Sequence, residues 1–413
     1  MNTQDLEQLR RIKFSVRRHC LVCQARLGKP LIDLPDFPLT EIYTRKPVKE
    51  RLGFVDQSFF ICGHCGHGQI NHIVDPKVLY AHTYFFRTST SPSAREATDR
   101  FLQFIQRTIK NKSFKTIVEV GCNDLYLLHL LKNRARHLVG IDPVLADYRG
   151  PVDPKIKVVV DFIEHVDLAQ AIGPSPDVVI SSHVLEHIAD PVDSIRKLLK
   201  YAGPDTLFFF QFPGLESLVG DFRFDQIFHQ HISYFTLPSV KYMLNGLDCD
   251  LVDAKVNPYH WGALMIAFRK KKSKMKASQV KAKAGKAIGM LDPAHVAGRY
   301  KMFVHTMALV NERLQSLKNE KVYGYGAALM LPVLSYHLKN DLSSLECIVD
   351  DDPNKAVLSY VNLPVKICSS QKVNVGGATV LITATTALSN VRNILPKVIA
   401  LKPKQIIVPL NIF

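Results

Sequence analysis

Two cysteine doublets near the N-terminus have the spacing of metal ligands. Cys20 and Cys23 form one Cys-x-x-Cys turn, and Cys62 and Cys65 form a second one that continues into Gly66. Zinc prefers four tetrahedral thiolate or imidazole ligands, which two such turns supply. A closed shell of protein ligands leaves no position for a substrate, so we expect structural Zn²⁺ that stabilises the fold. Four unligated thiols in a small core, or a redox-active set, are the alternatives.

A second pattern, about fifty residues further along, is typical of a nucleotide-binding turn. The β-branched segment Thr116–Val120 precedes Gly121, where the lack of a side chain lets the backbone pass close to a ligand. Asp142 ends the next apolar segment, where doubly wound folds hold ribose hydroxyls. Asp161 and Phe162 follow the third segment, and they are suited to an adenine amine and its ring.

The number of glycines in this turn distinguishes between cofactors. Dinucleotide sites show the pattern G-x-G-x-x-G, whereas Gly121 stands alone before Asn123, so a pyrophosphate would be poorly held. S-adenosylmethionine has a ribose and an adenine but no phosphate. The turn therefore favours a cofactor site for S-adenosylmethionine that includes Gly121 and Asn123. A doubly wound domain without a cofactor is the alternative.

Two polar clusters follow predicted strands. Ser181–His187 comes directly after an apolar segment, and Phe224–Phe235 contains a His-Gln-His run between aromatic residues. Ligands in open α/β sheets bind at the carboxyl ends of strands. A single histidine there would be interpreted as structural, but two clusters indicate a substrate site next to the cofactor. The candidate residues are Ser182 and His183 on the cofactor side, and His187, His229, Gln230 and His231 on the catalytic side.

Composition and charge narrow the class of protein. The N-terminal stretch Met1–Arg18 is polar and basic, and no run reaches the ~20 apolar residues needed to span a bilayer. The four cysteines outside the doublets are scattered, which is typical of a reducing compartment, so we expect a cytoplasmic protein. The net charge of +16 is spread along the chain, apart from a run at Arg269–Lys276. This suits an anionic small substrate better than nucleic acid, although a nucleic-acid-binding zinc protein remains an alternative.

The 413 residues are too many for one ordinary core, and the chain divides into three parts. Residues 1–80 surround the doublets, residues 81–255 alternate strands and helices, and residues 256–413 form a second, smaller alternation. The α/β pattern predicts an N-terminal zinc-binding domain and a central Rossmann-like domain with a parallel sheet covered on both faces by helices, followed by a smaller Rossmann-like C-terminal domain. In the central part we expect strands at Thr116–Val120, His137–Ile141, Lys157–Val160, Asp177–Ser181 and Thr206–Phe212, and helices at Ala94–Asn111, Leu125–Lys132 and Val192–Tyr201.

The C-terminal part is predicted from the same periodicities. Two helical segments precede four short apolar segments of strand length. The helices are expected at Ala277–Met290 and Val296–Lys318, and the strands at Lys321–Tyr325, Leu345–Val349, Thr379–Thr383 and Gln405–Pro409.

The order of these motifs resembles the zinc-containing, S-adenosylmethionine-dependent sugar C-methyltransferases, among them the deoxysugar 3-C-methyltransferases, which act on nucleotide-linked 4-keto deoxysugars. The resemblance covers nearly the whole chain. It is carried by the two cysteine doublets, the Tyr/Ser-rich stretch Tyr80–Ser89, the turn Glu119–Asp124, the motif His183–His187, the motif Arg223–Phe235, the G-Y-G-A turn Gly324–Ala327 and the V-D-D-x-P-x-K motif Val349–Lys355.

The resemblance implies a class I methyltransferase fold and a carbon acceptor. A carbon next to a ketone loses a proton to a base and then takes the methyl group from S-adenosylmethionine. By resemblance, His231 is the base, His187 and Tyr84 bind or polarise the sugar, and the C-terminal domain binds the nucleotide sugar. Histidine is suited to this because its ordinary pKa lies near neutral pH.

Several positions depart from the pattern of that family. Phe228 replaces a tyrosine, Gln230 replaces a glutamate and Leu125 replaces a second glycine, while His260–Ala263 differs from a His-Gly-Gly-Ser motif. The changes gather on the substrate side. An O- or N-methyltransferase acting on a related molecule, or a non-catalytic binding protein with this fold, therefore remains an alternative.

Overall fold

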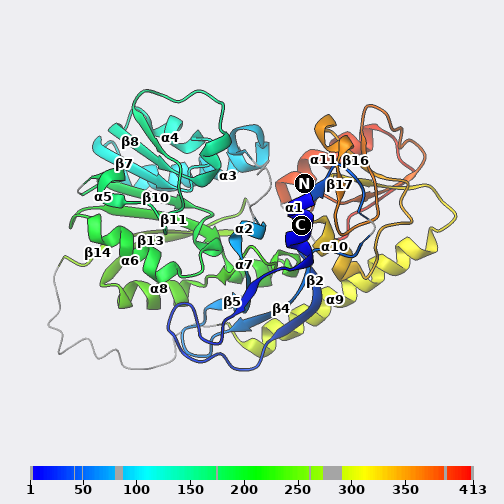
Figure 1. The fold of residues 1–413 in the computed structure, drawn as a ribbon, viewed down its shortest axis with the longest axis horizontal. Coiled ribbons are helices and arrows are strands. Elements are labelled where there is room, and N and C mark those ends of the chain that lie inside the picture. The colour runs from blue at the N-terminus through cyan, green and yellow to red at the C-terminus, as the bar shows by residue number, and fades with distance from the viewer. Residues whose placement is uncertain are drawn as a thin grey trace.

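The computed structural model describes residues 3–40, 42–48, 50–79, 87–173, 175–259, 262–272, 291–385 and 388–410. Figure 1 shows two α/β lobes side by side, with the N-terminal strands beneath and between them. Several sequence features lie outside the described residues. These are Tyr84 with the rest of the stretch 80–86, His260 with its neighbour Trp261, the predicted helix Ala277–Met290, and residues 273–276 of the basic run.

The N-terminal part forms a four-stranded antiparallel sheet of order β12-β5-β4-β2. In β4 the side chains of Val55, Gln57 and Phe59 alternate inward, as expected for a strand with one buried face. The edge strand β12 (Ser233–Tyr234) comes from the second histidine motif, so this sheet contacts the predicted catalytic segment. The other elements are α1 (Thr3–Arg10), β1 (Phe14–Val16), β2 (Ile32–Pro38), β3 (Tyr43–Thr44), β4 (Phe54–Ile61), β5 (Gly68–Ile70), β6 (His72–Val74) and α2 (Pro76–Leu79).

The central part is a seven-stranded sheet of order β13-β14-β11-β10-β7-β8-β9. All five predicted strands are present, as β7 to β11. The elements are η1 (Thr88–Thr90), α3 (Pro92–Ile109), β7 (Phe114–Val120), α4 (Tyr126–Leu131), β8 (Ala135–Ile141), η2 (Pro143–Asp147), β9 (Ile156–Val159), α5 (Leu168–Ile172), β10 (Val178–Ser182), η3 (Leu185–His187), α6 (Pro191–Tyr201), β11 (Leu207–Pro213), α7 (Leu215–Gly220), η4 (Phe224–Gln226), α8 (Leu237–Gly246), β13 (Cys249–Asn257) and β14 (Ala263–Lys270).

Helices cover both faces of this sheet, as predicted. Val118 and Val120 of β7 belong to the core shared with α5 and α6, while Ile117 belongs to the core shared with α3 and α4. Successive residues of β7 thus point to opposite layers, and both layers are apolar. Because β10, β7, β8 and β9 pair in parallel, their carboxyl ends lie along the same edge of the sheet.

The expectation of an all-parallel sheet is wrong at one edge. β14 runs antiparallel to both β11 and β13, so the sheet is mixed. The predicted domain boundary at residue 255 falls inside β13, and the sheet continues to Lys270. β13 is an edge strand with a bulge between Leu251 and Asp253, and most of its side chains are partly or fully exposed, which weakens the strand signal in the sequence.

The C-terminal part is a second, smaller α/β unit with a five-stranded parallel sheet of order β18-β16-β15-β19-β20. This confirms the predicted class of the C-terminal domain. The short strand β17 pairs instead with β3 of the N-terminal part. The elements are α9 (Pro293–Ser316), β15 (Val322–Tyr325), α10 (Leu331–Leu338), β16 (Ile348–Asp350), η6 (Pro353–Val357), β17 (Ser359–Tyr360), β18 (Ile367–Ser369), β19 (Thr379–Ile382), α11 (Leu388–Ala400) and β20 (Gln405–Ile407).

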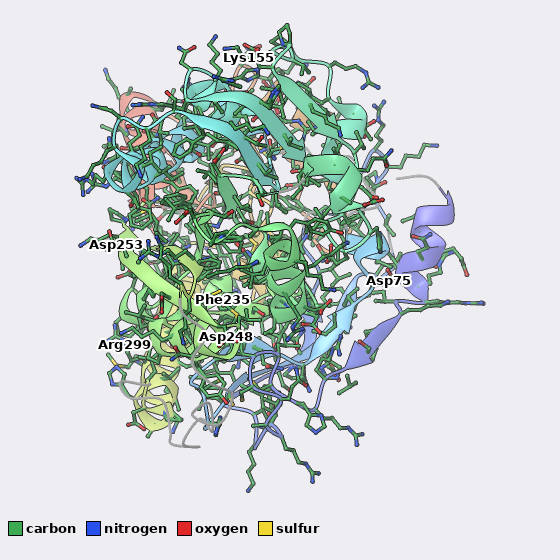
Figure 2. All side chains as sticks on the ribbon, turned by 90° about the vertical axis from the view of Figure 1, so that its left-hand side faces the viewer. Asp75, Lys155, Phe235, Asp248, Asp253 and Arg299 are labelled. Carbon is green, nitrogen blue, oxygen red and sulfur yellow. The ribbon has the colours of Figure 1, made fainter. Side chains whose placement is uncertain are left out.

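The long helix α9 links the lobes. It buries one stripe formed by Val296, Phe303, Met307 and Leu314, and it packs on α10 and α7. Arg299 lies on its first turns (Figure 2) and donates to the carbonyl oxygen at the end of α7, 2.7 Å away. Among the described residues, no helix has both the length and the apolar character needed to cross a bilayer.

Candidate functional site

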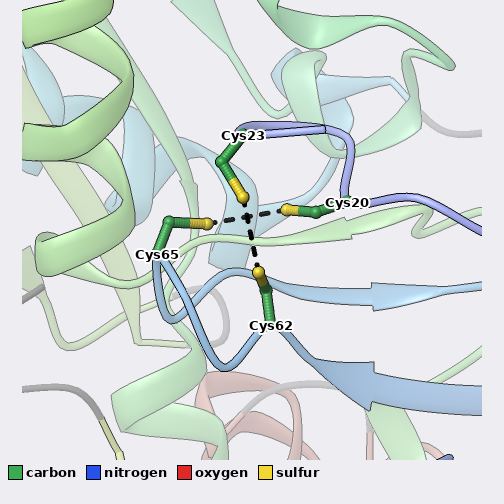
Figure 3. A group of neighbouring side chains, drawn as sticks. All are labelled: Cys20, Cys23, Cys62 and Cys65. Atoms are coloured by element: carbon green, nitrogen blue, oxygen red, sulfur yellow. Dashed lines mark hydrogen bonds between the residues drawn. The ribbon is translucent and has the colours of Figure 1, made fainter. Parts of the chain in front are cut away.

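The four predicted zinc ligands come together. The Sγ atoms of Cys20 and Cys65 are 3.5 Å apart, those of Cys23 and Cys62 are 3.4 Å apart, and all four lie within 4.8 Å of one another. Figure 3 shows the two turns facing each other with the four sulfur atoms directed at one centre. Tetrahedral Zn–S bonds of about 2.3 Å would place the sulfur atoms about 3.8 Å apart, so the donor set fits zinc.

The two cysteine turns share one backbone conformation. Gln24 N donates to Cys20 O at 3.0 Å, and Gly66 N donates to Cys62 O at 2.9 Å. Gln24 and Gly66 both have positive φ angles, of 60° and 75°. In each turn the first sulfur accepts the N–H two residues later at 3.4 Å, which favours a thiolate. Both turns are therefore arranged to present charged sulfur to a metal.

Burial of the cysteines favours a bound cation. Cys20 and Cys65 are completely buried, and Cys62 is only 3% exposed. Several buried thiolates so close together repel one another strongly, and a cation removes this cost. With four protein ligands the shell is closed, so Zn²⁺ here would hold the fold together.

Gly121 sits at the end of β7 with a φ of 74°. A Cβ atom at this position would lie 2.0 Å from Cγ2 of Val184, so no side chain fits. A glycine is thus required at position 121 because the loop that carries Val184 packs directly on the turn after β7. This contact places the Ser181–His187 cluster directly beside the predicted cofactor turn.

We expect Gly121→Ala to destabilise the central domain. The positive φ costs an alanine about 1–2 kcal/mol, and overlap with Val184 adds to this. We therefore expect a clearly lower midpoint of chemical denaturation. Gly298→Ala is the matched control, because Gly298 lies in α9 with open space around its Cβ position. Alanine should raise stability there by up to about 1 kcal/mol. Equal effects of the two changes would contradict this account of Gly121.

Asp142 lies at the carboxyl end of β8, next to Gly121, and is 7% exposed. Its Oδ2 accepts from Asn123 N at 2.7 Å, and its Oδ1 accepts from Val144 N at 2.9 Å. Burial raises its pKa, while these two N–H groups favour the charged form. Each oxygen keeps a further acceptor site, so the carboxylate can take two ribose hydroxyls.

Asp161 and Phe162 lie at the outer end of the same edge, just after β9. The Phe162 ring is 40% exposed, and Asp161 Oδ1 accepts from the Phe162 backbone N–H at 2.8 Å. An exposed aromatic ring beside an acceptor fits the predicted contact with adenine.

Asn123 and Asp124 hold the C-terminal end of the Tyr/Ser-rich stretch. Asn123 Oδ1 accepts from Thr88 N at 3.3 Å, and Asp124 Oδ2 accepts from Ser89 N at 2.8 Å. The other oxygen of Asp124 is buried and has no hydrogen-bond partner among the described residues. Burial, together with the neighbouring aspartates, raises the pKa of Glu119 well above its ordinary value, which favours a neutral carboxyl group under this turn.

Ser182 and His183 follow β10 and are held by β11. Gln211 Nε2 donates to Ser182 Oγ at 2.8 Å, and His183 N donates to Gln211 O at 2.9 Å. His183 Nδ1 lies 3.0 Å from Glu186 Oε1. Burial lowers the pKa of His183 to about 4, so the ring is neutral at physiological pH.

Glu186, His187 and His231 form a cluster in which Glu186 and His231 are buried and His187 is partly buried. Their ligand-type atoms lie within 4.8 Å of one another, and the two imidazole centroids are 4.9 Å apart. His187 Nδ1 lies 2.8 Å from Gln230 O. A carbonyl oxygen only accepts, so Nδ1 carries hydrogen and Nε2 of neutral His187 is an acceptor. Burial also lowers the pKa of His187, which favours this neutral form.

Two hydrogen bonds join the motifs that carry this cluster. One is the bond from His187 to Gln230 O, and the other runs from Ile232 N to Glu186 O at 2.7 Å. The Phe228 ring packs on His231 with 4.2 Å between centroids. The sequence therefore brings His187 and His231 together as predicted, on loops that fix each other.

His229 and Gln230 point the other way, into the N-terminal part. His229 Nε2 lies 3.0 Å from Val55 O of β4, and burial lowers the pKa of His229 to about 4. Thr40 Oγ1 donates to Gln230 Oε1 at 2.5 Å. These two side chains join the domains, and a part for them in catalysis stays a prediction.

Comparisons with known proteins identify two of the domains. A family model described as "Methyltransferase domain" matches residues 93–254, and one described as "Putative zinc binding domain" matches residues 20–80. The chain carries a class I methyltransferase domain. The predicted combination of this domain with an N-terminal zinc-binding domain is confirmed.

Among curated proteins, C-methyltransferase NovU from Streptomyces niveus is 25% identical over 211 residues. The aligned part covers 50% of this chain and 49% of NovU, so the match spans about half the length of that relative. Among solved structures, the N-methyltransferase NodS from Bradyrhizobium japonicum WM9 is 13% identical, with a TM-score of 0.33 over 44% of this chain and 98% of NodS. The 1,6-didemethyltoxoflavin-N1-methyltransferase from Burkholderia thailandensis is also 13% identical, with a TM-score of 0.33 over 42% of this chain and 78% of that chain.

Two residues of the methyltransferase domain were missed as site candidates. Gln211 holds both Ser182 and His183 from β11, and its signal is a lone amide in an otherwise apolar strand. Glu186 is the second, and its signal is a carboxylate inside a His-rich motif after a strand. Gln211 and Glu186 contact candidate residues such as Ser182 and His183, and a sequence motif alone does not show such contacts.

Proposed function

We propose that this protein transfers a methyl group from S-adenosylmethionine to the carbon next to the ketone of a nucleotide-activated deoxysugar. The observation that carries the proposal is the imidazole pair of buried His231 and partly buried His187, on a loop that packs against the cofactor turn at Gly121. A base is needed where a carbon acid meets an electrophilic methyl group. The name of NovU, a C-methyltransferase, supports a carbon acceptor.

The methyltransferase domain offers a separate group of side chains to each part of the cofactor. S-adenosylmethionine, when bound, offers an electrophilic methyl group on a sulfonium sulfur. Asp142 would take the ribose hydroxyls, and Asp161 with Phe162 would take the adenine. Asn123, Ser182 and His183 would contact the cofactor beside Gly121, against which the loop that carries His187 packs. This order would direct the methyl group towards His187 and His231.

The imidazole pair would perform the proton transfer. The C–H bond next to the ketone breaks, and its proton goes to His231. The freed electron pair forms the new C–C bond, while the electrons of the broken S–CH3 bond stay on sulfur. In neutral His187 the hydrogen is on Nδ1, so Nε2 would accept a hydrogen bond from a sugar hydroxyl. Burial keeps water from this site and strengthens each electrostatic contact.

The C-terminal domain repeats the hydrogen-bond pattern of the cofactor site, which supports nucleotide binding there. Ala327 N donates to Asp350 Oδ2 at 2.6 Å, and Asp352 N donates to Asp350 Oδ1 at 2.9 Å. Asp142 likewise accepts from two backbone N–H groups. Each of the two aspartates stands at the carboxyl end of the second strand of its domain along the chain, β8 for Asp142 and β16 for Asp350. A carboxylate in this position is suited to a ribose, and the net charge of +16 is suited to a diphosphate.

Cofactor binding is tested by calorimetric titration with S-adenosylhomocysteine. We expect Asp142→Ala to weaken binding by about 10–100-fold, because hydrogen bonds to a charged group contribute about 1.5–3 kcal/mol. Asp142→Asn is the companion variant, since an amide oxygen can still accept one backbone N–H. Circular dichroism should show both variants folded. Unchanged affinity in folded Asp142→Ala would remove the ribose assignment.

The acceptor is tested with cofactor carrying a ¹³C-labelled methyl group and a panel of nucleotide-linked 4-keto deoxysugars. A new ¹³C signal of a methyl group on carbon supports the proposal, and a methyl group on oxygen or nitrogen replaces it with the corresponding transferase. In D₂O without the cofactor, the base should exchange the proton next to the ketone. Cofactor binding without exchange or transfer on any sugar would indicate a binding protein.

A further inference from the structure

A carboxyl group lies beside the imidazole pair, but it does not come from position 230. Glu186 is completely buried, and its Oε1 lies 3.0 Å from His183 Nδ1. A carboxylate oxygen of Glu186 and one nitrogen each of His187 and His231 lie within 4.8 Å of one another. Its Oε2 is buried and has no hydrogen-bond partner among the residues that the structure describes.

Position 230 offers no charge to this pair. Gln230 is neutral, and its side-chain oxygen accepts from Thr40 in the N-terminal part. Only the backbone oxygen of Gln230 reaches the pair, through His187 Nδ1 at 2.8 Å. Among the residues that the structure describes, the carboxyl group grouped with these imidazoles is that of Glu186, on the loop after β10.

We propose that Glu186 is the positioning residue that sets the protonation state of the His187–His231 pair, and that it does so in place of a carboxylate at position 230. The inference rests on the proposed function, in which this pair moves the proton. A carboxylate this close to an imidazole favours the imidazolium form, and burial strengthens the interaction. A proton taken from the substrate would thus be stabilised on the pair without solvent.

Among the described residues, the titratable groups near Glu186 are three imidazoles and one phenol. His183 and His187 lie on the same loop, His231 comes from the segment after η4, and Tyr234 comes from β12. Burial raises the pKa of Tyr234, and the charge of Glu186 adds to this shift. Burial raises the pKa of Glu186 itself to about 7, which lies in the range where imidazoles titrate. Glu186 and the imidazole pair can therefore share one proton near neutral pH.

The test is a pH titration by NMR of full-length protein labelled with ¹⁵N-histidine and ¹³C-glutamate, with S-adenosylhomocysteine bound. In wild type, the signals of His187 and His231 should titrate together with the carboxyl carbon of Glu186. Glu186→Gln keeps an acceptor for His183 Nδ1–H but removes the charge. The apparent pKa values of the pair should then fall by at least about one unit, which is a tenfold loss of imidazolium at fixed pH. Glu186→Asp should restore part of this shift.

Gln230→Glu is the matched comparison. Its side chain faces Thr40, so a carboxylate there should leave the titration of the pair in the Glu186→Gln background unrestored. Restoration by Gln230→Glu, or unchanged titration in folded Glu186→Gln, would overturn the proposal. If the Glu186 variants do not fold, independent titration of Glu186 and the pair in wild type overturns it.

Metal binding by the cluster and a failure of methyl transfer can each be distinguished from a failure of the Glu186 assignment. The cluster also has a ligand set that could hold a metal, so wild type and Glu186→Gln should be equilibrated with Zn²⁺ and their metal content measured. One ion per chain in both is expected, and a second ion lost in Glu186→Gln would overturn the proposal. The titration needs no sugar. A shifted titration combined with no methyl transfer would therefore contradict the proposed function and leave the assignment of Glu186 standing.

Discussion

Replacement of His231 by glutamine should lower the rate of methyl transfer about 10²–10⁴-fold while leaving cofactor binding intact, because that range is what a positioned general base contributes. The ring packs between Phe228 and His187, whereas the hydrogen bonds of Asp142 at the predicted cofactor edge go to Asn123 and Val144. Single-turnover rates with saturating sugar measure the loss, and calorimetry with S-adenosylhomocysteine measures binding. The exchange of the substrate proton in D₂O should fall by the same factor.

His229→Gln is the matched control, two residues away. A glutamine amide can still donate to Val55 O, so this variant tests the domain contact. We expect lower thermal stability and a much smaller loss of rate than in His231→Gln. Equal rate losses in both variants would show that the motif acts only through folding, and full activity of His231→Gln would remove His231 as the base.

The elements that can be predicted best from this sequence are those whose own residues carry the pattern, without help from distant segments. The strands β7 to β11 are apolar along most of their length because helices cover both faces, and their positions match the predicted segments closely. β13 was missed because it is an edge strand whose side chains are partly exposed and whose ladder has a bulge. The N-terminal sheet was missed because its edge strand β12 is two residues long and comes from a distant segment: Ser233 pairs with Gln69 of β5, 164 positions earlier in the sequence.

The same distinction applies to the site. The zinc ligands and Asp142 could be found from spacing, because a Cys-x-x-Cys turn and an acid after the second strand have the same geometry wherever they occur. The directions of His229, Gln230 and His231 could not be found this way. They depend on which neighbour lies on each side of the loop, and those neighbours, Val55 and Thr40, are 174 and 190 positions away in the sequence.

Loss of zinc should affect both stability and catalysis, although a closed shell of four cysteines takes no part in the chemistry itself. The turn Cys62–Cys65 continues into residues that contact the catalytic segment. Gly66 O accepts from Thr236 Oγ1 at 3.2 Å, and the His67 ring packs on Phe235 with 4.9 Å between centroids. Gly68 of β5 then pairs with Tyr234 of β12, three residues after His231. Loosening this turn should therefore loosen the loop that holds the base.

We expect Cys62→Ser to lose the bound zinc and to lower the thermal transition of the N-terminal part by more than about 10 °C, because structural zinc contributes about 10–16 kcal/mol of apparent binding free energy in small zinc domains. Methyl transfer should fall at temperatures where the rest of the chain remains folded. Metal content by mass spectrometry, melting by circular dichroism and single-turnover rates measure the three effects.

Cys368→Ser is the matched control, because Cys368 is a partly buried cysteine in β18 outside the cluster. It should keep one zinc per chain and melt within a few degrees of wild type, since a change of about 1 kcal/mol shifts the melting of a domain of this size by only a few degrees. Removal of the metal by a chelator should reproduce the effects of Cys62→Ser in wild type. A zinc-free wild-type protein with normal melting and normal rate would contradict both the metal assignment and its link to the catalytic loop.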